Sequence, residues 1–270
     1  HLSLRRQRQM CIRDRVKRVL FMSKKNEAYP VVLITGAAKR IGAELARLFS
    51  TNGFTCIIHY NTSKHEADEL AKSLNEKRSD SCFTIQGDLN TDSTVTKIFE
   101  FCTQLGRLDV LVNNASSFYP TPLDDCNQAQ WDDLINSNLK SPFFIAKALA
   151  PLLRKNNGSI VNISDMHARQ ALANHPIYSI AKAGNIAMTK TLAKELAPNV
   201  RVNSVAPGAI LWPEHETDDL EKQQSILSKV PMGKLGSEKD ITETTYFLAV
   251  EATYMTGQTI AVDGGSSNSL

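Results

Sequence analysis

The 270 residues, 42% of them hydrophobic and 22% charged, suffice for one large domain, and no apolar run approaches the roughly 20 residues that a membrane span needs. Five cysteines without ligand-like spacing argue against a disulfide framework or a metal site, and they predict reduced thiols in the cytoplasm. The net charge of +3 arises in residues 1–21, which hold seven basic residues and one Asp and so carry +6. Residues 22–270 therefore carry −3, which argues against a basic nucleic-acid-binding domain.

Residues 1–21 form a basic head without a helical or strand period. Such a head could be an arm for nucleic acid or for an anionic surface, or an Arg-rich targeting peptide. It also resembles the translated read-through of sequencing adapters, and Met22 followed by Ser23 and two lysines would make an ordinary start. We therefore interpret residues 1–21 as a non-native or disordered basic extension and residues 22–270 as a single domain.

Short apolar runs alternate with amphipathic stretches along most of the chain. The runs predict strands at Pro30–Ile34, Thr55–Tyr60, Cys82–Gln86, Leu108–Val112, Ile160–Ile163, Val200–Val205 and Gln258–Val262. The other stretches predict helices at Ala43–Ser50, Lys64–Asn75, Thr91–Leu105, Ala129–Leu153, Tyr178–Leu196 and Ile241–Val250. This alternation predicts an α/β fold with a single Rossmann-type, doubly wound parallel sheet and helices on both faces. Residues 209–240 are irregular, as is typical of a loop that covers a Rossmann-type crevice.

The first predicted strand runs into the turn TGAAKRIG at Thr35–Gly42. Gly36 and Gly42 would allow a tight turn, so that backbone N–H groups of the next helix can bind a pyrophosphate. Arg40, beside Ile41, replaces the usual middle glycine and adds a guanidinium that suits phosphate. A purely structural turn is the alternative, but its place after the first strand of a βαβ unit favours a dinucleotide contact by these residues.

The end of the second strand indicates which dinucleotide binds. An NAD-preferring site places an acid there, which binds the ribose 2′-hydroxyl and would repel a 2′-phosphate. The chain has no acid in this segment, whose expected cofactor contacts are His59, Tyr60, Asn61 and Ser63. We therefore predict NADPH. After the third strand, Asp88 can present its carboxylate to the adenine amino group, unless it is only a helix cap.

Tyr178 and Lys182 lie four residues apart in a predicted helix and so share one face. A nearby ammonium favours the phenolate, and we expect Lys182 to lower the pKa of Tyr178 toward working pH. A phenol tuned in this way can donate or accept a proton from a reacting substrate atom. The alternative is that Tyr178 belongs to the core and Lys182 to a solvated face.

Five motifs occur in one order along the chain. They are Thr35-Gly36, Asn113-Asn114-Ala115, Asn138, Tyr178-x-x-x-Lys182 and Asn203–Gly208 (NSVAPG). With them the chain resembles the short-chain dehydrogenase/reductase family from about Pro30 to the C-terminus. Thr35–Gly42, Asn113–Leu123 (NNASSFYPTPL) and Ser164-Asp165 look like pteridine reductases. That narrower resemblance implies NADPH-dependent reduction of a dihydropterin to a tetrahydropterin, with folates as a further substrate class.

The same resemblance implies the site residues. The catalytic residues would be Asn138, Asp165, Tyr178 and Lys182. The remaining cofactor contacts would be Leu89, Asn114, Ala115, Ser116, Tyr178, Lys182, Pro207 and Gly208. The substrate contacts would be Arg40, Ser116, Phe118, Asp165 and Tyr178. Phe118 would offer an aromatic face on which a pterin stacks opposite the nicotinamide. Asn138 would order a water or backbone group between Lys182 and solvent. The family's homotetramer would form through residues 129–153 and 177–196.

Asp165 separates the two reductase chemistries. Most short-chain reductases have a Ser thirteen residues before the catalytic Tyr, and that position here is Asp165. An ionised Asp accepts hydrogen bonds but cannot donate them, so it would repel the oxygen of a developing alkoxide. It suits the reduction of a C=N bond, in which Tyr178 protonates the nitrogen. Two alternatives remain open. Asp165 could be a mere helix cap, or a one-residue slip could bring Ser164 into its place.

Two alternative functions remain open as well. The chain could be a generic short-chain carbonyl reductase acting, for example, on 3-oxoacyl thioesters, although Asp165 argues against it. It could also bind NADPH without catalysis, although the intact pair of Tyr178 and Lys182 argues against that. Thr62 stands where pteridine reductases tend to carry a basic residue, which departs from their pattern.

Overall fold

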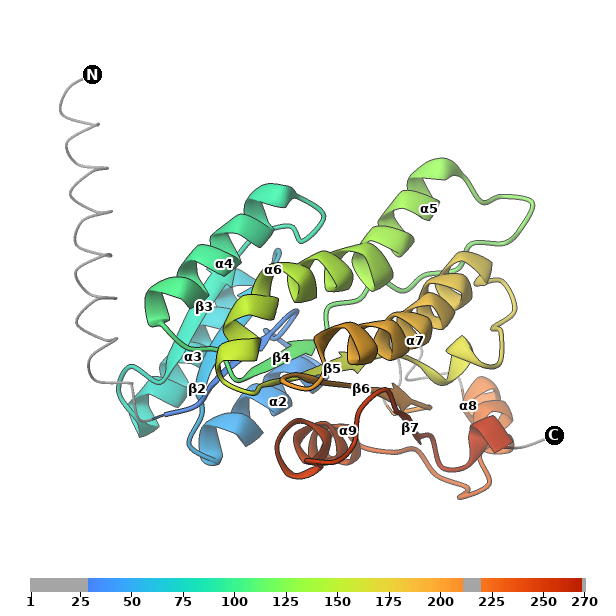
Figure 1. The fold of residues 1–270 in the computed structure, drawn as a ribbon. Helices are drawn as coiled ribbons and strands as arrows, with labels where there is room; N and C mark the ends of the chain where they lie inside the picture. Colours follow the sequence, from blue (N-terminus) through green and yellow to red (C-terminus); the bar gives the residue numbers. More distant parts are fainter. Residues whose placement is uncertain (1–28, 211–219, 269–270) are drawn as a thin grey trace.

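The computed structural model describes residues 29–210 and 220–268 (Figure 1). The predicted extension at residues 1–21 and the middle of the predicted crevice loop, residues 211–219, lie outside the described residues. None of the helices in the described ranges combines the length and apolar character that crossing a bilayer takes.

One parallel sheet runs through the described part of the chain, in the strand order β3-β2-β1-β4-β5-β6-β7. Its strands are β1 (Val31–Ile34), β2 (Thr55–Tyr60), β3 (Cys82–Gln86), β4 (Val110–Asn113), β5 (Ser159–Ile163), β6 (Arg201–Pro207) and β7 (Thr259–Val262). The chain winds outward from β1 in one direction and from β4 in the other. The carboxyl ends of these two strands therefore flank the topological switch point, where ligands of such sheets bind.

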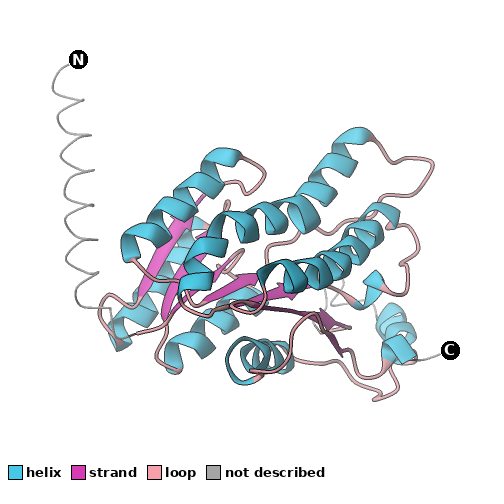
Figure 2. Cartoon of the chain, viewed as in Figure 1, coloured by secondary structure: helices cyan, strands magenta, loops and turns pink. Residues whose placement is uncertain are grey.

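Helices cover both faces of the sheet (Figure 2). They are α2 (Arg40–Thr51), α3 (Lys64–Lys77), α4 (Asp92–Leu105), α5 (Gln128–Ile135), α6 (Ser141–Lys155), α7 (Pro176–Leu196), α8 (Leu220–Leu227) and α9 (Glu238–Tyr246). Alternate strand residues point to opposite faces, so Val32 and Ile34 pack with α2, α3 and α9, whereas Val31 and Leu33 pack with α4, α6 and α7. The predicted doubly wound fold is confirmed.

The predicted helix at 129–153 is interrupted. It consists of α5, a π-helical turn at Asn136–Lys140 and α6, in which Pro142 is the second residue. Proline has no N–H, so the carbonyl of Asn138 has no donor at the usual position four residues later. Hydrophobic spacing does not reveal such a turn, because the apolar face continues on both sides of it.

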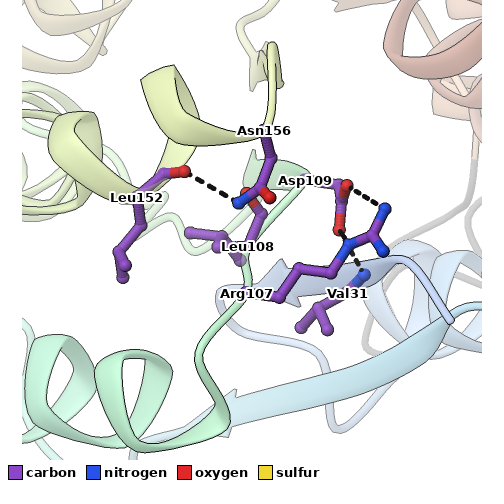
Figure 3. A network of polar contacts seen from close by, with 6 residues as sticks. All are labelled: Val31, Arg107, Leu108, Asp109, Leu152 and Asn156. Carbon is purple, nitrogen blue, oxygen red and sulfur yellow. Dashed lines mark hydrogen bonds and ion pairs between the residues drawn. The ribbon is translucent and has the colours of Figure 1, made fainter. Parts of the chain in front are cut away.

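The amino ends of the strands are held by a polar network at the edge opposite the switch point (Figure 3). The Asp109 carboxylate accepts from the Val31 N–H at 2.7 Å and pairs with the Arg107 guanidinium at 2.8 and 2.9 Å. Asn156 Nδ2 donates to the carbonyls of Leu108 and Leu152 at 3.1 and 2.9 Å. These bonds join the starts of β1 and β4 to the end of α6.

Arg201, at the start of β6, is expected to stabilise the fold without touching the switch point. Its guanidinium donates to the carbonyls of Leu248, Ala249 and Ala252 at 2.6, 2.6 and 2.9 Å, where a helix ends. Arg201→Met should lower the free energy of unfolding by roughly 2–4 kcal/mol, because charge-assisted hydrogen bonds to partly buried carbonyls are lost. Urea denaturation would measure it, with the exposed Arg154→Met as control. Equal losses in the two variants would contradict this role.

Candidate active site

The turn after β1 is tied to the segment after β4. Thr35 Oγ1 accepts hydrogen bonds from the N–H groups of Asn114 and Ala115 at 2.9 and 3.0 Å. Asn114 Nδ2 donates to the carbonyls of Thr35 and Gly36 at 2.9 and 3.0 Å. Gly36 has φ +61°, and a Cβ there would lie 2.8 Å from Ala115 Cα. Only glycine fits this position without strain.

The turn leads directly into α2. A Cβ on Gly42 would lie 2.5 Å from the Gly36 carbonyl oxygen, so glycine is needed for this close approach. Arg40 has φ +50°, a left-handed conformation that costs a non-glycine residue about 1–2 kcal/mol. Its side chain is exposed, and that of Ile41 packs partly on the core. The conformation explains why glycine is usual at position 40, and the exposed guanidinium is what Arg40 adds.

His59 lies beneath this turn. The Gly36 N–H donates to Nδ1 at 3.3 Å, which makes Nε2 the protonated nitrogen that donates to the Gly87 carbonyl at 2.9 Å. Burial lowers the pKa of His59 to about 4, against the smaller raising effect of the Gly87 bond. Both ring nitrogens are therefore engaged by the protein, so His59 supports the turns after β1 and β3. Its contact with the cofactor stays a prediction.

The other predicted cofactor residues lie along the carboxyl edge of the sheet. Asn61 and Asp88 are exposed, Ser63 precedes α3, and the Asp88 carboxylate also accepts from the Asn90 N–H at 2.9 Å. Tyr60 and Leu89 pack against the core. Pro207 ends β6, and the Gly208 N–H donates to the Val262 carbonyl at 3.0 Å, with no room for a Cβ beside Asp263.

Asp165 faces Tyr178. The Tyr178 hydroxyl donates to Asp165 Oδ2 at 2.7 Å, and Asp165 Oδ1 accepts from the His167 N–H at 2.8 Å. The carboxylate thus caps the short helix after β5 and accepts from the phenol at the same time, so capping does not prevent Asp165 from orienting Tyr178. Ser164 is buried, and its hydroxyl donates to the Lys182 carbonyl at 3.4 Å. The slip that would bring Ser164 to Tyr178 is therefore excluded.

Lys182 lies one turn from Tyr178, as predicted, and is fully buried. Its Nζ donates to the Ile163 carbonyl at 3.0 Å and lies 5.5 Å from the centroid of the Tyr178 ring. Burial lowers the pKa of Lys182 to about 8, while Asp165 opposes the shift. Burial and then the Asp165 charge raise the pKa of Tyr178 well above its ordinary value, against a smaller effect of the Ser116 hydroxyl. The expectation that Lys182 lowers the pKa of Tyr178 is wrong for this arrangement.

Asn138 holds the loop that follows β4. Its Oδ1 accepts from the Ser116 hydroxyl at 2.7 Å, and its Nδ2 donates to the carbonyls of Ser117 and Leu134 at 2.9 and 3.0 Å. Asn138 is fully buried. The structure therefore gives its side chain an anchoring position, whereas the link between Lys182 and solvent stays a prediction.

Phe118 lies in this loop and is 53% exposed. Its ring stacks on the His175 imidazole, with centroids 4.8 Å apart and planes 9° apart, and it meets the Tyr178 ring edge-on at 4.8 Å. One face of Phe118 is thus covered by His175, and about half of its side chain stays exposed. Sequence reasoning missed His175, although its place three residues before Tyr178 could have indicated it.

The structure brings Ser116, Phe118, Asn138, Asp165, Tyr178 and Lys182 together at the switch point. The glycine turn and Arg40 lie at the end of the neighbouring β1. No group of three or more His, Cys, Asp or Glu side chains within residues 29–210 and 220–268 is arranged to hold a metal ion. A buried acid–base pair next to a dinucleotide-type turn can transfer a proton to a ligand held at this edge.

Comparison with known proteins agrees with this geometry. The family model described as enoyl-(acyl carrier protein) reductase matches residues 36–267. The 3-oxoacyl-(acyl-carrier-protein) reductase FabG of Staphylococcus aureus strain Mu50 is 37% identical over 237 residues, which are 86% of this chain and 96% of that protein. Pteridine reductase 1 of Leishmania tarentolae is 36% identical over 282 residues, covering 88% of this chain and 96% of that protein. The chain belongs to the short-chain dehydrogenase/reductase family of NAD(P)-dependent oxidoreductases.

Proposed function

We propose that this chain catalyses the NADPH-dependent reduction of a pterin, from the dihydro to the tetrahydro form, with folates as a further substrate class. The observation that carries the proposal is the 2.7 Å hydrogen bond from the Tyr178 hydroxyl to the Asp165 carboxylate. A carbonyl reductase needs a donor at the position of Asp165 to stabilise the developing oxyanion. A carboxylate there favours a substrate nitrogen, which receives a proton and leaves no alkoxide behind.

The residues at the switch point fit NADPH. Gly36 and Gly42 let the backbone N–H groups at the start of α2 approach a pyrophosphate, and the exposed Arg40 guanidinium can bind phosphate oxygens. The segment between β2 and α3 has no acid to repel a 2′-phosphate, and Ser63 stands before the N-terminus of α3. When bound, NADPH supplies the hydride.

The protein's own residues manage the proton. Because the pKa of Tyr178 is raised, its hydroxyl keeps its proton at neutral pH, as the donor in a reduction must. Asp165, fixed by the His167 N–H, orients that hydroxyl and can pass a proton to it from solvent. Lys182, whose Nζ lies 5.5 Å from the centroid of the Tyr178 ring, would bind the nicotinamide ribose, as the family resemblance implies.

The substrate would contact the exposed part of the Phe118 ring. A pterin is flat and aromatic, so it can stack on an aromatic side chain that His175 supports from one face. Ser116 and Arg40 offer a hydroxyl and a guanidinium to polar atoms on the ring. The ring nitrogen to be protonated would then point at the hydroxyl of Tyr178, whose ring lies 4.8 Å from that of Phe118 between centroids.

Reduction of a 3-oxoacyl thioester is the second candidate. It is favoured by the relatives of that name in Staphylococcus aureus and in Thermotoga maritima, the latter 37% identical over 238 residues, 87% of this chain and 96% of that protein. Their identity to this chain is close to that of the pteridine reductase, so sequence similarity alone favours neither substrate. The Asp165 carboxylate is the feature that argues for the pterin.

The test offers NADPH with a dihydropterin, dihydrofolate or a 3-oxoacyl thioester to protein that starts at Met22. We expect the dihydropterin to be reduced. Asp165→Ser should lower kcat/KM for it by about 10²-fold, since one positioned group in proton transfer contributes on that scale, and should raise turnover of the thioester. Asp133→Ser is the matched control, because Asp133 also accepts from a tyrosine hydroxyl, that of Tyr119.

Each other outcome has a definite meaning. Wild-type turnover confined to the thioester would replace the pterin proposal with the carbonyl-reductase candidate. Bound NADPH without turnover of any of the three substrates would leave a binding protein without catalysis. Equal effects of Asp165→Ser and Asp133→Ser would remove Asp165 from the chemistry.

A cytoplasmic homotetramer is part of the same proposal. The helices that the family uses for assembly expose large apolar side chains here, namely Trp131, Phe143, Phe144 and Ile180. Exposed apolar side chains gathered on neighbouring helices mark an interaction surface. A second copy of this chain is the occupant we propose for it.

A further inference from the structure

The feature that carries a further inference is a polar contact between α7 and the π-helical turn. Asn185 Nδ2 donates to the Asn138 carbonyl at 3.2 Å, the same carbonyl that Pro142 leaves without its usual helical donor. The two elements meet closely, because a Cβ on Gly184 would lie 2.7 Å from Leu139 Cδ2. Glycine at 184 therefore lets Asn185 reach the turn.

The contact is dry. Asn185 is 2% exposed and Asn138 is fully buried. Asn185 Oδ1 is a buried acceptor for which the described residues provide no donor. Among these residues, the side chain therefore forms its hydrogen bond through Nδ2, which donates to the Asn138 carbonyl. A hydrogen bond in such surroundings is stronger than in water, and an unpaired buried carbonyl is costly.

This contact connects the two halves of the site. Helix α7 carries the proton donor Tyr178 and its neighbour Lys182, one turn before Asn185. The side chain of Asn138 in turn holds Ser116 and Ser117, and Phe118 follows directly in the chain. Asn185 thereby sets how far the proton donor lies from the loop that would bind the substrate.

We propose that Asn185 is a positioning residue of the active site, which holds the Asn138 carbonyl and through it the Ser116–Phe118 loop in register with Tyr178. Its kinetic consequence rests on the proposed reductase function, whereas its structural consequence does not. The role requires a hydrogen-bond donor at position 185, which distinguishes it from a role in packing alone.

Two substitutions of similar shape separate these roles. Asn185→Leu fills the space but has no hydrogen-bond donor, so its kcat should be lowered at every pH. Asn185→Asp can donate to the carbonyl only when its carboxyl is protonated. Burial favours the neutral carboxyl and raises its pKa, so this variant should work in mild acid and lose activity as the pH rises and the carboxylate forms.

Asn156 supplies the matched controls. It is also an asparagine whose Nδ2 donates to backbone carbonyls, but at the opposite edge of the sheet (Figure 3). We expect Asn185→Leu to lower kcat about tenfold across the pH range with the Kd for NADPH unchanged. Asn185→Asp should approach wild type near pH 6 and lose about tenfold by about pH 8, the scale of one buried hydrogen bond. Asn156→Leu and Asn156→Asp should keep the wild-type profile.

A profile of Asn185→Asp that runs parallel to that of wild type would overturn the proposal. Hydrogen exchange of residues 114–119 gives a readout that needs no substrate. Exchange there should rise about two- to tenfold in Asn185→Leu and stay unchanged in Asn156→Leu. If wild type turned over no substrate, the proposed function would fail, and the exchange result alone would then decide: unchanged exchange in Asn185→Leu overturns the positioning role.

Discussion

Tyr178→Phe is expected to lower kcat for pterin reduction by about 10²–10⁴-fold, the contribution of a positioned general acid. The substitution removes only the hydroxyl, which donates to Asp165 at 2.7 Å. The ring keeps its edge-on contact with Phe118 and its place above Lys182. Binding of NADPH should therefore survive, since the glycine turn is untouched. Stopped-flow measurement of NADPH oxidation, together with a fluorescence titration of NADPH binding, would separate the two effects.

Tyr119→Phe is the control for this variant. The Tyr119 hydroxyl donates to the Asp133 carboxylate at 3.0 Å, and its ring packs against the cluster that contains Tyr178. The same kind of bond is therefore lost nearby, with the bond between Tyr178 and Asp165 left intact. Its kcat should stay within a few-fold of wild type. If Tyr178→Phe retained wild-type turnover, Tyr178 would not be the proton donor, and the proposed mechanism would fail with it.

Lys182→Met is expected to inactivate the protein and to stabilise it at neutral pH. Folding lowers the pKa of Lys182 from the ordinary 10.5 to about 8. Between these two values the unfolded chain binds the proton and the folded protein does not, so wild-type stability rises with pH from about 8 to about 10.5. Below that window the buried charge lowers the stability of the wild-type protein by roughly 3 kcal/mol. The gain in stability of Lys182→Met is smaller than this, because the variant loses the hydrogen bond to the Ile163 carbonyl.

Urea denaturation as a function of pH would test this expectation. At pH 7 the variant should be the more stable protein, and its advantage should shrink as the pH rises above about 8. Lys190→Met, at an exposed position of the same helix, serves as the control. A variant that is less stable than wild type at pH 7, with no dependence on pH, would mean that the protein compensates the buried charge fully.

The sheet and its helices could be predicted because their causes are local in the sequence. Apolar runs such as Val31–Ile34 and the 3.6-residue spacing of α3 and α7 encode burial directly. The spacing of Tyr178 and Lys182 likewise follows from helix geometry. The glycine turn could be predicted too, although its reason, the close approach of Gly36 to Ala115, involves residues far apart in the chain.

The rest of the site depends on tertiary neighbours that a sequence pattern does not contain. The raised pKa of Tyr178 results from burial and from Asp165, whereas the spacing alone suggested the effect of Lys182. The stack of His175 on Phe118 joins two loops. In the sequence, Asn185 has the pattern of an ordinary helix residue. Its hydrogen bond to the Asn138 carbonyl becomes visible only with Pro142 and the π-helical turn in place.

The neutral ring of His59 has a consequence for acid tolerance. It accepts from Gly36 on one side and donates to Gly87 on the other, so the loops after β1 and β3 share a single support. An imidazolium has hydrogens on both nitrogens and could not accept from Gly36. Protonation at a pH below about 4 would therefore remove the acceptor that holds the Gly36 N–H. We expect strong acid to weaken nucleotide binding through the loss of this one hydrogen bond.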